Sequence, residues 1–197
     1  MIDTIDSERR RLLTNLTALT AAVGTGFVAA PFVSSWKPSA RARAIGAPVD
    51  VDISKLEPGA MITVEWRGKP VWIVRRTPAM LEQVAAAHYF LSDPESSNSL
   101  QPAYATNALR SVKPEYLVLL GVCTHLGCTP MAKFTSGDQT MSADWPGGFY
   151  CPCHGSKFDL SGRVFKNVPA PTNLTVPPYE FVGAGRILVG RDATQAA

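Results

Sequence analysis

The chain has 197 residues, enough for one domain with a substantial core plus appendages, and its formal net charge is only +3 with 18% charged residues. A balance this mild, without a clustered face of Lys and Arg, excludes a basic nucleic-acid-binding protein, so we expect no nucleic-acid partner. The 16 prolines and 15 glycines predict many short turns, as in a small β-rich domain.

An uncharged stretch near the N-terminus, residues 12–33, predicts a transmembrane anchor helix. As a helix it would reach about 33 Å, enough to cross the hydrocarbon core of a bilayer. The stretch is only moderately apolar, because several threonines, two glycines and Pro31 interrupt it. We expect an uncleaved, single-pass anchor. The alternative is a cleaved signal peptide with Ala40-Arg41-Ala42 as its cleavage site.

Residues 1–11 predict a cytoplasmic N-terminus. Residues 9–13, Arg-Arg-Arg-Leu-Leu, resemble a twin-arginine (Tat) signal, which exports folded proteins, although Glu8 stands where that pattern prefers Ser or Thr. The rule that positive charge stays inside does not settle the orientation, because basic residues also follow the span: Lys37, Arg41 and Arg43.

Residues 34–48 predict a tether to a head domain at residues 49–197. They contain two prolines and several small residues but no apolar periodicity. Fully extended, they span at most about 50 Å. The residues themselves distinguish neither an inert linker nor a hinge.

The head domain begins with short β-branched runs that predict antiparallel strands at residues 49–53, 61–66 and 71–75. Thr77 followed by Pro78 predicts a capped helix to about Ala87. His88 has no cysteine neighbour, so we expect it on the surface and not in a metal site. Further along, we expect a loop at residues 92–101, a short helix at 104–110, and strands at 116–121, 131–134 and 186–189.

Two short segments hold nearly all of the soft metal-binding side chains. All four cysteines and two of the three histidines lie in Cys123-Thr124-His125-Leu126-Gly127-Cys128 and Cys151-Pro152-Cys153-His154-Gly155-Ser156. Each segment pairs one cysteine with a histidine two or three positions on, so two thiolates and two imidazoles make a four-ligand set. The remaining cysteines, Cys128 and Cys153, have the count for one disulfide.

This ligand set is that of a Rieske-type [2Fe–2S] cluster, in which two His replace two Cys on one of the irons. Tetrahedral zinc also accepts two Cys and two His, but its usual spacing places two Cys together and then two His together. The C-x-H and C-x-x-H spacing therefore favours the iron–sulfur cluster. A zinc-stabilised binding module is the alternative.

The two segments resemble the Rieske proteins of bacterial cytochrome bc1 complexes, and the resemblance extends over residues 116–181. It implies a mainly β fold, an antiparallel sandwich with a small cluster-binding part at about residues 116–172. It implies a disulfide between Cys128 and Cys153, and hence an oxidising compartment, which in a bacterium is the periplasm. It implies one [2Fe–2S] cluster with these ligands: Cys123 and Cys151 on the inner iron, His125 and His154 on the outer iron.

Residues beside the ligands also have roles that the resemblance implies. The Ser156 hydroxyl would bond a bridging sulfide, and Leu126 would shield the cluster and pack into the quinol pocket. Gly127 and Gly155 permit tight loops with backbone N–H groups near the sulfurs. Residues 168–171, Val-Pro-Ala-Pro, resemble a third loop that is usually Gly-Pro-Ala-Pro. Phe158 stands where high-potential members have a tyrosine that bonds a ligand thiolate.

The resemblance implies the Rieske subunit of a proton-translocating quinol:cytochrome c oxidoreductase in the bacterial inner membrane. His154 would accept a hydrogen bond and then the proton from ubiquinol, as one electron goes to the cluster and the other to cytochrome b. The head would then move on its tether to cytochrome c1. The implied partners are cytochrome b, cytochrome c1, ubiquinol and the lipid bilayer. The alternatives are a Rieske subunit of another quinol-oxidising complex or of a periplasmic arsenite oxidase.

Overall fold

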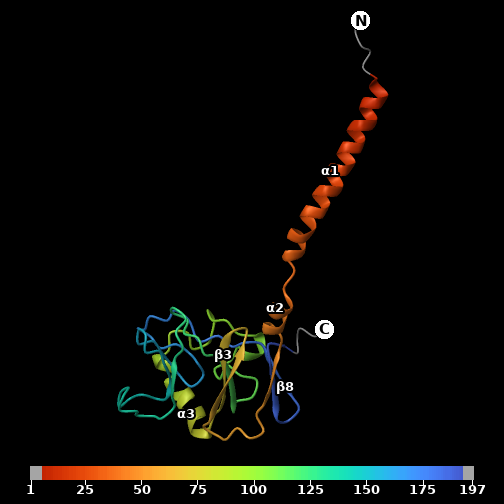
Figure 1. The fold of residues 1–197 in the computed structure, drawn as a ribbon. Helices are drawn as coiled ribbons and strands as arrows, with labels where there is room; N and C mark the ends of the chain where they lie inside the picture. Colours follow the sequence, from red (N-terminus) through yellow and green to blue (C-terminus); the bar gives the residue numbers. More distant parts are fainter. Residues whose placement is uncertain (1–5, 193–197) are drawn as a thin grey trace. The chain divides into compact units, whose positions relative to one another are not determined.

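A computed structural model describes residues 6–192 of the chain. They divide into two compact units, one up to Ala44 and the other from Ile45 onward (Figure 1). The first unit is dominated by helix α1, Ser7–Ser35. Its N-cap is Asp6, whose carboxylate accepts hydrogen bonds from the backbone N–H groups of Glu8 and Arg9, both at 3.2 Å. This cap satisfies amide donors that have no partner inside the helix.

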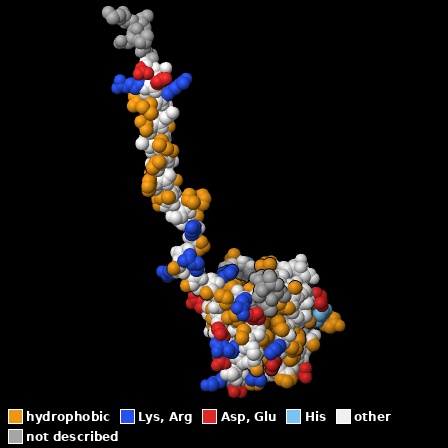
Figure 2. Space-filling model, turned by 90° about the vertical axis from the view of Figure 1, so that its right-hand side faces the viewer, with side chains coloured by type: hydrophobic (Ala, Val, Ile, Leu, Met, Phe, Trp, Pro, Cys, Tyr) orange, Lys and Arg blue, Asp and Glu red, His pale blue; other side chains and the backbone are white. Residues whose placement is uncertain are grey.

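Helix α1 contains the predicted anchor, residues 12–33, and extends past it at both ends. None of its residues is buried, and apolar side chains cover much of its visible face (Figure 2). Within residues 6–192 one helical stretch, Ser7–Gly46, is long and apolar enough to cross a membrane, because it contains an 18-residue window with a mean hydropathy of 1.7. Its threonines are compatible with lipid because their hydroxyls donate to backbone carbonyls of the preceding turn, as for Thr14, Thr17, Thr20 and Thr25.

A second helix lies inside the predicted tether, residues 34–48, where no helix was predicted. Helix α2, Ala40–Ile45, lies inside this stretch. The Ser39 hydroxyl accepts a hydrogen bond from the backbone N–H of Ala42 at 3.1 Å, so Ser39 caps the helix. Ala and Arg, which fill most of α2, are among the strongest helix formers, and their local preference overrides the absence of an apolar pattern.

The second unit contains three antiparallel sheets of three strands each. The first sheet has the order β1-β9-β8, with β1 at Val49–Asp52, β8 at Tyr179–Val182 and β9 at Arg186–Val189. The second has the order β2-β3-β4, with β2 at Met61–Trp66, β3 at Lys69–Arg75 and β4 at Tyr116–Leu120. The third has the order β5-β6-β7, with β5 at Met131–Lys133, β6 at Gly148–Tyr150 and β7 at Lys157–Phe158. The mainly β, antiparallel head domain was predicted correctly.

The hairpin of β2 and β3 turns on two residues, Arg67 and Gly68, both with positive φ, 52° and 70°. This turn is tighter than the sequence indicated, so β3 begins at Lys69 rather than at Val71. Helix α3, Pro78–Ala86, starts as predicted: the Thr77 hydroxyl accepts the backbone N–H of Met80 at 3.2 Å. A 3₁₀ turn, Ala87–Phe90, then holds His88 at the surface.

The helix predicted at residues 104–110 is wrong. The structure has only a 3₁₀ turn, Ala103–Ala105. The Asn107 side chain accepts the backbone N–H of Leu109 at 3.1 Å, which offers the chain an alternative to helical bonding, and Arg110 has a φ of 51°. Strands β6, β7 and β8 were not predicted from the sequence either. β8 is recognisable only by its pairing with β9.

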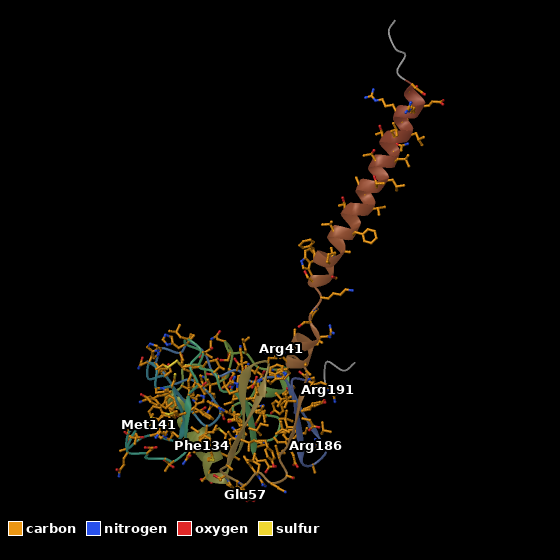
Figure 3. All side chains as sticks on the ribbon, in the orientation of Figure 1. Arg41, Glu57, Phe134, Met141, Arg186 and Arg191 are labelled. Carbon is orange, nitrogen blue, oxygen red and sulfur yellow. A yellow bond between two sulfur atoms is a disulfide. The ribbon has the colours of Figure 1, made fainter. Side chains whose placement is uncertain are left out.

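Side chains crowd the interior of the head, whereas those of α1 point away from the helix (Figure 3). The core is formed by the middle strands, with Val71, Ile73, Leu117 and Leu119 all 0% exposed. These residues support β4, which leads directly into the first cysteine segment. Strand β6 leads into the second.

Candidate metal centre

The two cysteine-containing segments, which we call loop 1 (residues 123–128) and loop 2 (residues 151–156), have the same backbone hydrogen bonding. In each, the N–H of the first cysteine bonds to the carbonyl five residues later. The distance is 2.7 Å from Cys123 to Cys128 and 2.8 Å from Cys151 to Ser156. Two segments of different sequence therefore close in the same way, and each brings its first cysteine to the base of a tight turn.

The glycines complete this turn. Gly127 N–H donates to the Cys123 carbonyl at 3.0 Å, and Gly155 N–H donates to the Cys151 carbonyl at 2.9 Å. Both glycines have left-handed backbone, with φ of 86° and 78°. A residue with a Cβ adopts this conformation only at a cost in free energy, so the backbone conformation of the turn explains why glycine stands at both positions.

A disulfide joins the two loops through Cys128 and Cys153, whose Cα atoms are 6.7 Å apart. The sulfur atoms of Cys128, Cys151 and Cys153 lie within 4.8 Å of one another. Because two of these three are bonded to each other, Cys151 is the one free thiol of the group. The other free thiol is Cys123 on loop 1. Each loop thus contributes one free thiol and one half of the disulfide.

Both free thiols are shut off from solvent, with Cys123 3% and Cys151 2% exposed. Burial raises the pKa of the Cys123 thiol and the neighbouring Cys151 thiol raises it further, while the backbone N–H of His125 and the hydroxyl of Ser156 lower it. A buried thiolate needs a positive partner to offset its desolvation, and a metal ion is the partner that thiolates bind most strongly.

The imidazole rings of the two loop histidines lie next to each other, edge to face. The ring centroids of His125 and His154 are 4.8 Å apart and their planes are almost perpendicular, at 89°. His125 is half-buried and His154 is exposed. Leu126, next to His125, leaves 72% of its surface exposed. The site therefore has a buried sulfur side and an open imidazole side.

The third loop, residues 168–171, and Thr172 directly after it are hydrogen-bonded to loop 2 and loop 1. The buried Ser156 hydroxyl accepts the backbone N–H of Ala170 at 3.1 Å. The Thr124 hydroxyl donates to the Thr172 carbonyl at 2.7 Å. Sequence reasoning missed Thr124, because no periodicity or spacing marks a hydroxyl that reaches a carbonyl 48 residues away.

Val168 replaces the usual glycine at the start of the third loop without strain at that residue. The positive φ falls one position earlier, at Asn167, with a φ of 58°. Asparagine is among the residues that tolerate left-handed backbone best, so it accommodates the turn that the loop requires.

Phe158 lies on β7 opposite Phe149 and is fully buried. It belongs to the same apolar core cluster as Cys123 and Cys151. The ring is therefore inside the core to which the two thiols belong and not among the exposed residues of the loops.

The donor set fits a [2Fe–2S] group. Two buried sulfurs on one side and two imidazoles on the other match the unequal ligation of the two irons in a Rieske centre. The backbone N–H of His125 and the hydroxyl of Ser156 hydrogen-bond the Cys123 sulfur, which is the kind of support that cluster sulfurs need. Cys128 and Cys153 are tied up in the disulfide, so they do not compete as ligands.

Comparison with known proteins gives matches over nearly the whole chain. Residues 48–180 match the family described as Rieske [2Fe-2S] domain, and residues 2–39 match the Tat signal family of the ubiquinol–cytochrome c reductase Fe-S subunit. The ubiquinol-cytochrome c reductase iron-sulfur subunit of Allochromatium vinosum is 54% identical, over 98% of this chain and 93% of its own. The subunit of the same name from Blastochloris viridis is 43% identical, over 95% of this chain and 96% of its own.

Among solved structures, a chain of "Hyperthermophilic respiratory Complex III" aligns with 88% of this chain and 97% of its own, at 26% identity and a TM-score of 0.47. The family rests on the sequence matches, which include both the cluster-binding domain and the N-terminal signal. The chain belongs to the Rieske iron–sulfur subunits of the ubiquinol–cytochrome c reductases.

Proposed function

We propose that this chain is the iron–sulfur subunit of a bacterial cytochrome bc1 complex, in which it takes an electron and a proton from ubiquinol and delivers the electron to cytochrome c1. The observation that supports this most directly is the difference in burial within loops 1 and 2: the two free thiols are buried, whereas His154 and Leu126 are exposed. A substrate can reach the imidazole side without disturbing the sulfur side.

Each residue at the tip has a distinct task in this proposal. Cys123, Cys151, His125 and His154 would hold the [2Fe–2S] group, which when bound supplies a one-electron acceptor. The exposed His154 ring binds the quinol hydroxyl and accepts its proton. Leu126 is apolar and exposed beside His125, so it docks in the quinol pocket and excludes water there.

Purification of the complex tests this function. The full chain should show the visible absorption of an iron–sulfur protein and should copurify with the b- and c1-type haem proteins. A colourless, zinc-containing product would refute the cluster. A coloured protein that copurifies with a molybdenum oxidase, without haem b, would instead place the chain in an arsenite-oxidising complex.

Leu126 offers a second test with a matched control. Leu100 is exposed to 74%, close to the 72% of Leu126, and lies in none of the three loops. Leu126→Ala should lower quinol oxidation in the assembled complex by about tenfold or more, the factor that loss of a well-seated leucine contact represents. Leu100→Ala should leave the rate unchanged. Equal effects of the two substitutions would count against docking through Leu126.

The membrane arrangement is part of the proposal. Residues 1–11 would lie in the cytoplasm, residues 12–33 would cross the inner membrane once, residues 34–48 would be the tether, and the head at residues 49–197 would be periplasmic. The Tat-signal match and the disulfide support this direction. Protease added to spheroplasts should digest the head and spare an N-terminal tag. Protection of the head would reverse the topology.

A further inference from the structure

Trp72 of β3 lies against Gly121, which follows β4 and stands two positions before Cys123, the first residue of loop 1. A Cβ placed on Gly121 would be 2.4 Å from Cε2, 2.6 Å from Cζ2 and 2.7 Å from Nε1 of the Trp72 indole. These distances leave no room for a side chain, so the indole packs directly on the Gly121 backbone. A hydrogen bond also holds Gly121 to the same strand, because its N–H donates to the Pro70 carbonyl of β3 at 2.8 Å.

The same indole also contacts the strand that leads into loop 2. Trp72 stacks on Phe149, with ring centroids 5.0 Å apart and planes only 8° from parallel. Phe134, labelled in Figure 3, meets the same Phe149 edge-on, with centroids 5.5 Å apart. Trp72 is 3% exposed and Phe149 is 0% exposed, so the stack is part of the interior.

The two contacts occupy equivalent positions relative to the metal-binding loops. Gly121 precedes Cys123 by two residues, and Phe149 precedes Cys151 by two residues. The strands that carry these loops, β4 and β6, belong to different sheets, so no ladder of hydrogen bonds sets their mutual position. The Cys128–Cys153 disulfide joins the two loops directly. Two residues before the first cysteine of each loop, the Trp72 indole contacts the incoming chain.

We propose that Trp72 is a positioning residue for the metal centre: its indole sets the spacing between Cys123 and Cys151 by holding Gly121 and Phe149 in fixed places. This rests on the proposed ligand set. The contacts that carry this role are with Gly121 and Phe149, so Trp72 acts through the chain that leads into each loop. Because cores are close-packed, removing the indole leaves a space into which either strand can shift.

The protein supplies a matched control in Trp66. It is also a tryptophan of the β2-β3-β4 sheet, and it is 6% exposed. Its indole packs on a different glycine: a Cβ on Gly190 would lie 2.3 Å from Trp66 Nε1. Gly190 follows β9 and leads into neither loop. Replacing either tryptophan by leucine removes the same atoms from the same sheet, but only one of them adjoins the loops.

The experiment compares Trp72→Leu with Trp66→Leu in the purified full chain. Three quantities are measured: the rate at which a thiol reductant opens the Cys128–Cys153 disulfide, the EPR g-values of the reduced protein, and the thermal midpoint. Both variants should lower the midpoint. Only Trp72→Leu should shift the g-values and speed disulfide opening, by about tenfold, the order expected when an aromatic stack is lost. Unchanged g-values and opening rate in Trp72→Leu, or equal changes in Trp66→Leu, would overturn the proposal.

A compensating pair keeps the test decisive if Trp72→Leu folds poorly. Gly121→Ala places a methyl group where the indole stands, so alone it should shift the g-values strongly. Combined with Trp72→Phe, whose smaller ring has no atom at Cζ2, one of the three atoms nearest that methyl, it should be partly rescued. Additive damage in the double variant would contradict a direct contact between the two positions. The wild-type spectrum reports the ligand set separately, so failure of the proposed function is distinguishable from failure of this inference.

Discussion

Asp159 and Arg163 form an ion pair closed to solvent: a carboxylate oxygen lies 2.8 Å from the guanidinium, and each side chain is 1% exposed. The same carboxylate accepts the backbone N–H of Ser161 at 2.9 Å. Arg163 in turn donates to the Val84 carbonyl of α3 at 2.7 Å. The pair therefore links the turn that follows β7 to helix α3.

Asp159→Asn should destabilise the head domain strongly. The amide has nearly the same shape, but it leaves the buried Arg163 guanidinium without a counter-charge, a change that costs about 3–5 kcal/mol. Denaturant unfolding of the purified chain measures this loss. The control is Asp50→Asn, which breaks an ion pair with Arg186 whose side chains are 47% and 54% exposed and should cost less than about 1 kcal/mol. Similar losses in the two variants would show that burial does not govern the strength of the pair.

Cys153→Ser should loosen both cluster loops while leaving the four proposed ligands in place. The disulfide closes a loop with a sequence separation of 25, and its loss should cost about 3 kcal/mol of stability. Cluster content after purification should fall along with it. Mass spectrometry without reductant should find Cys128 and Cys153 linked in the wild type. Two free thiols there, in a protein that retains its cluster, would be incompatible with this arrangement.

Phe158→Tyr should raise the midpoint potential. A hydroxyl that donates to a ligand sulfur stabilises the reduced, more negative state more than the oxidised one. If the two states differ by about 1 kcal/mol in this bond, a one-electron couple shifts by about 40 mV. Phe158 is fully buried, so the new hydroxyl also needs a partner there. Redox titration decides the matter: an unchanged or lowered potential with a normal spectrum means that the hydroxyl does not reach sulfur.

Tyr104 should make the stability of the head depend on alkaline pH. Its phenol donates to the Tyr179 carbonyl at 2.9 Å and accepts the Tyr179 N–H at 2.8 Å. Burial raises the pKa of Tyr104 to about 12. In the unfolded chain a tyrosine pKa is about 10, so the folded state keeps the proton longer. Its contribution is therefore complete below about pH 10 and is lost as the pH rises through about 12.

Comparison with Tyr104→Phe isolates this effect, because all other titrating groups are common to the two proteins. The difference in free energy of unfolding should be constant from neutral pH to about pH 10 and should shrink above it. Urea unfolding at several pH values supplies the measurement. A difference that remains constant to about pH 12 would exclude Tyr104 as the source of the dependence.

Local features of the head were largely predictable because neighbouring residues decide them. Thr77 caps α3 at the predicted residue, since a hydroxyl and the amide three residues later meet wherever a helix starts. The helix predicted at residues 104–110 failed for an equally local reason, because the Asn107 side chain competes for backbone hydrogen bonds and Arg110 takes a positive φ. Helix α2 was missed because Ser39 and short-range propensity act without an apolar stripe.

The nature of the metal centre was determined by the sequence itself, because the spacing of Cys and His in two short segments is a property of the chain before it folds. The tertiary structure decided which parts of that centre are buried and which are open. Cys123 belongs to the buried core, whereas Leu126, three residues on, is 72% exposed. Contacts such as Trp72 with Phe149 join segments far apart in the chain, so their positions depend on how separate sheets pack and leave no signal in local sequence.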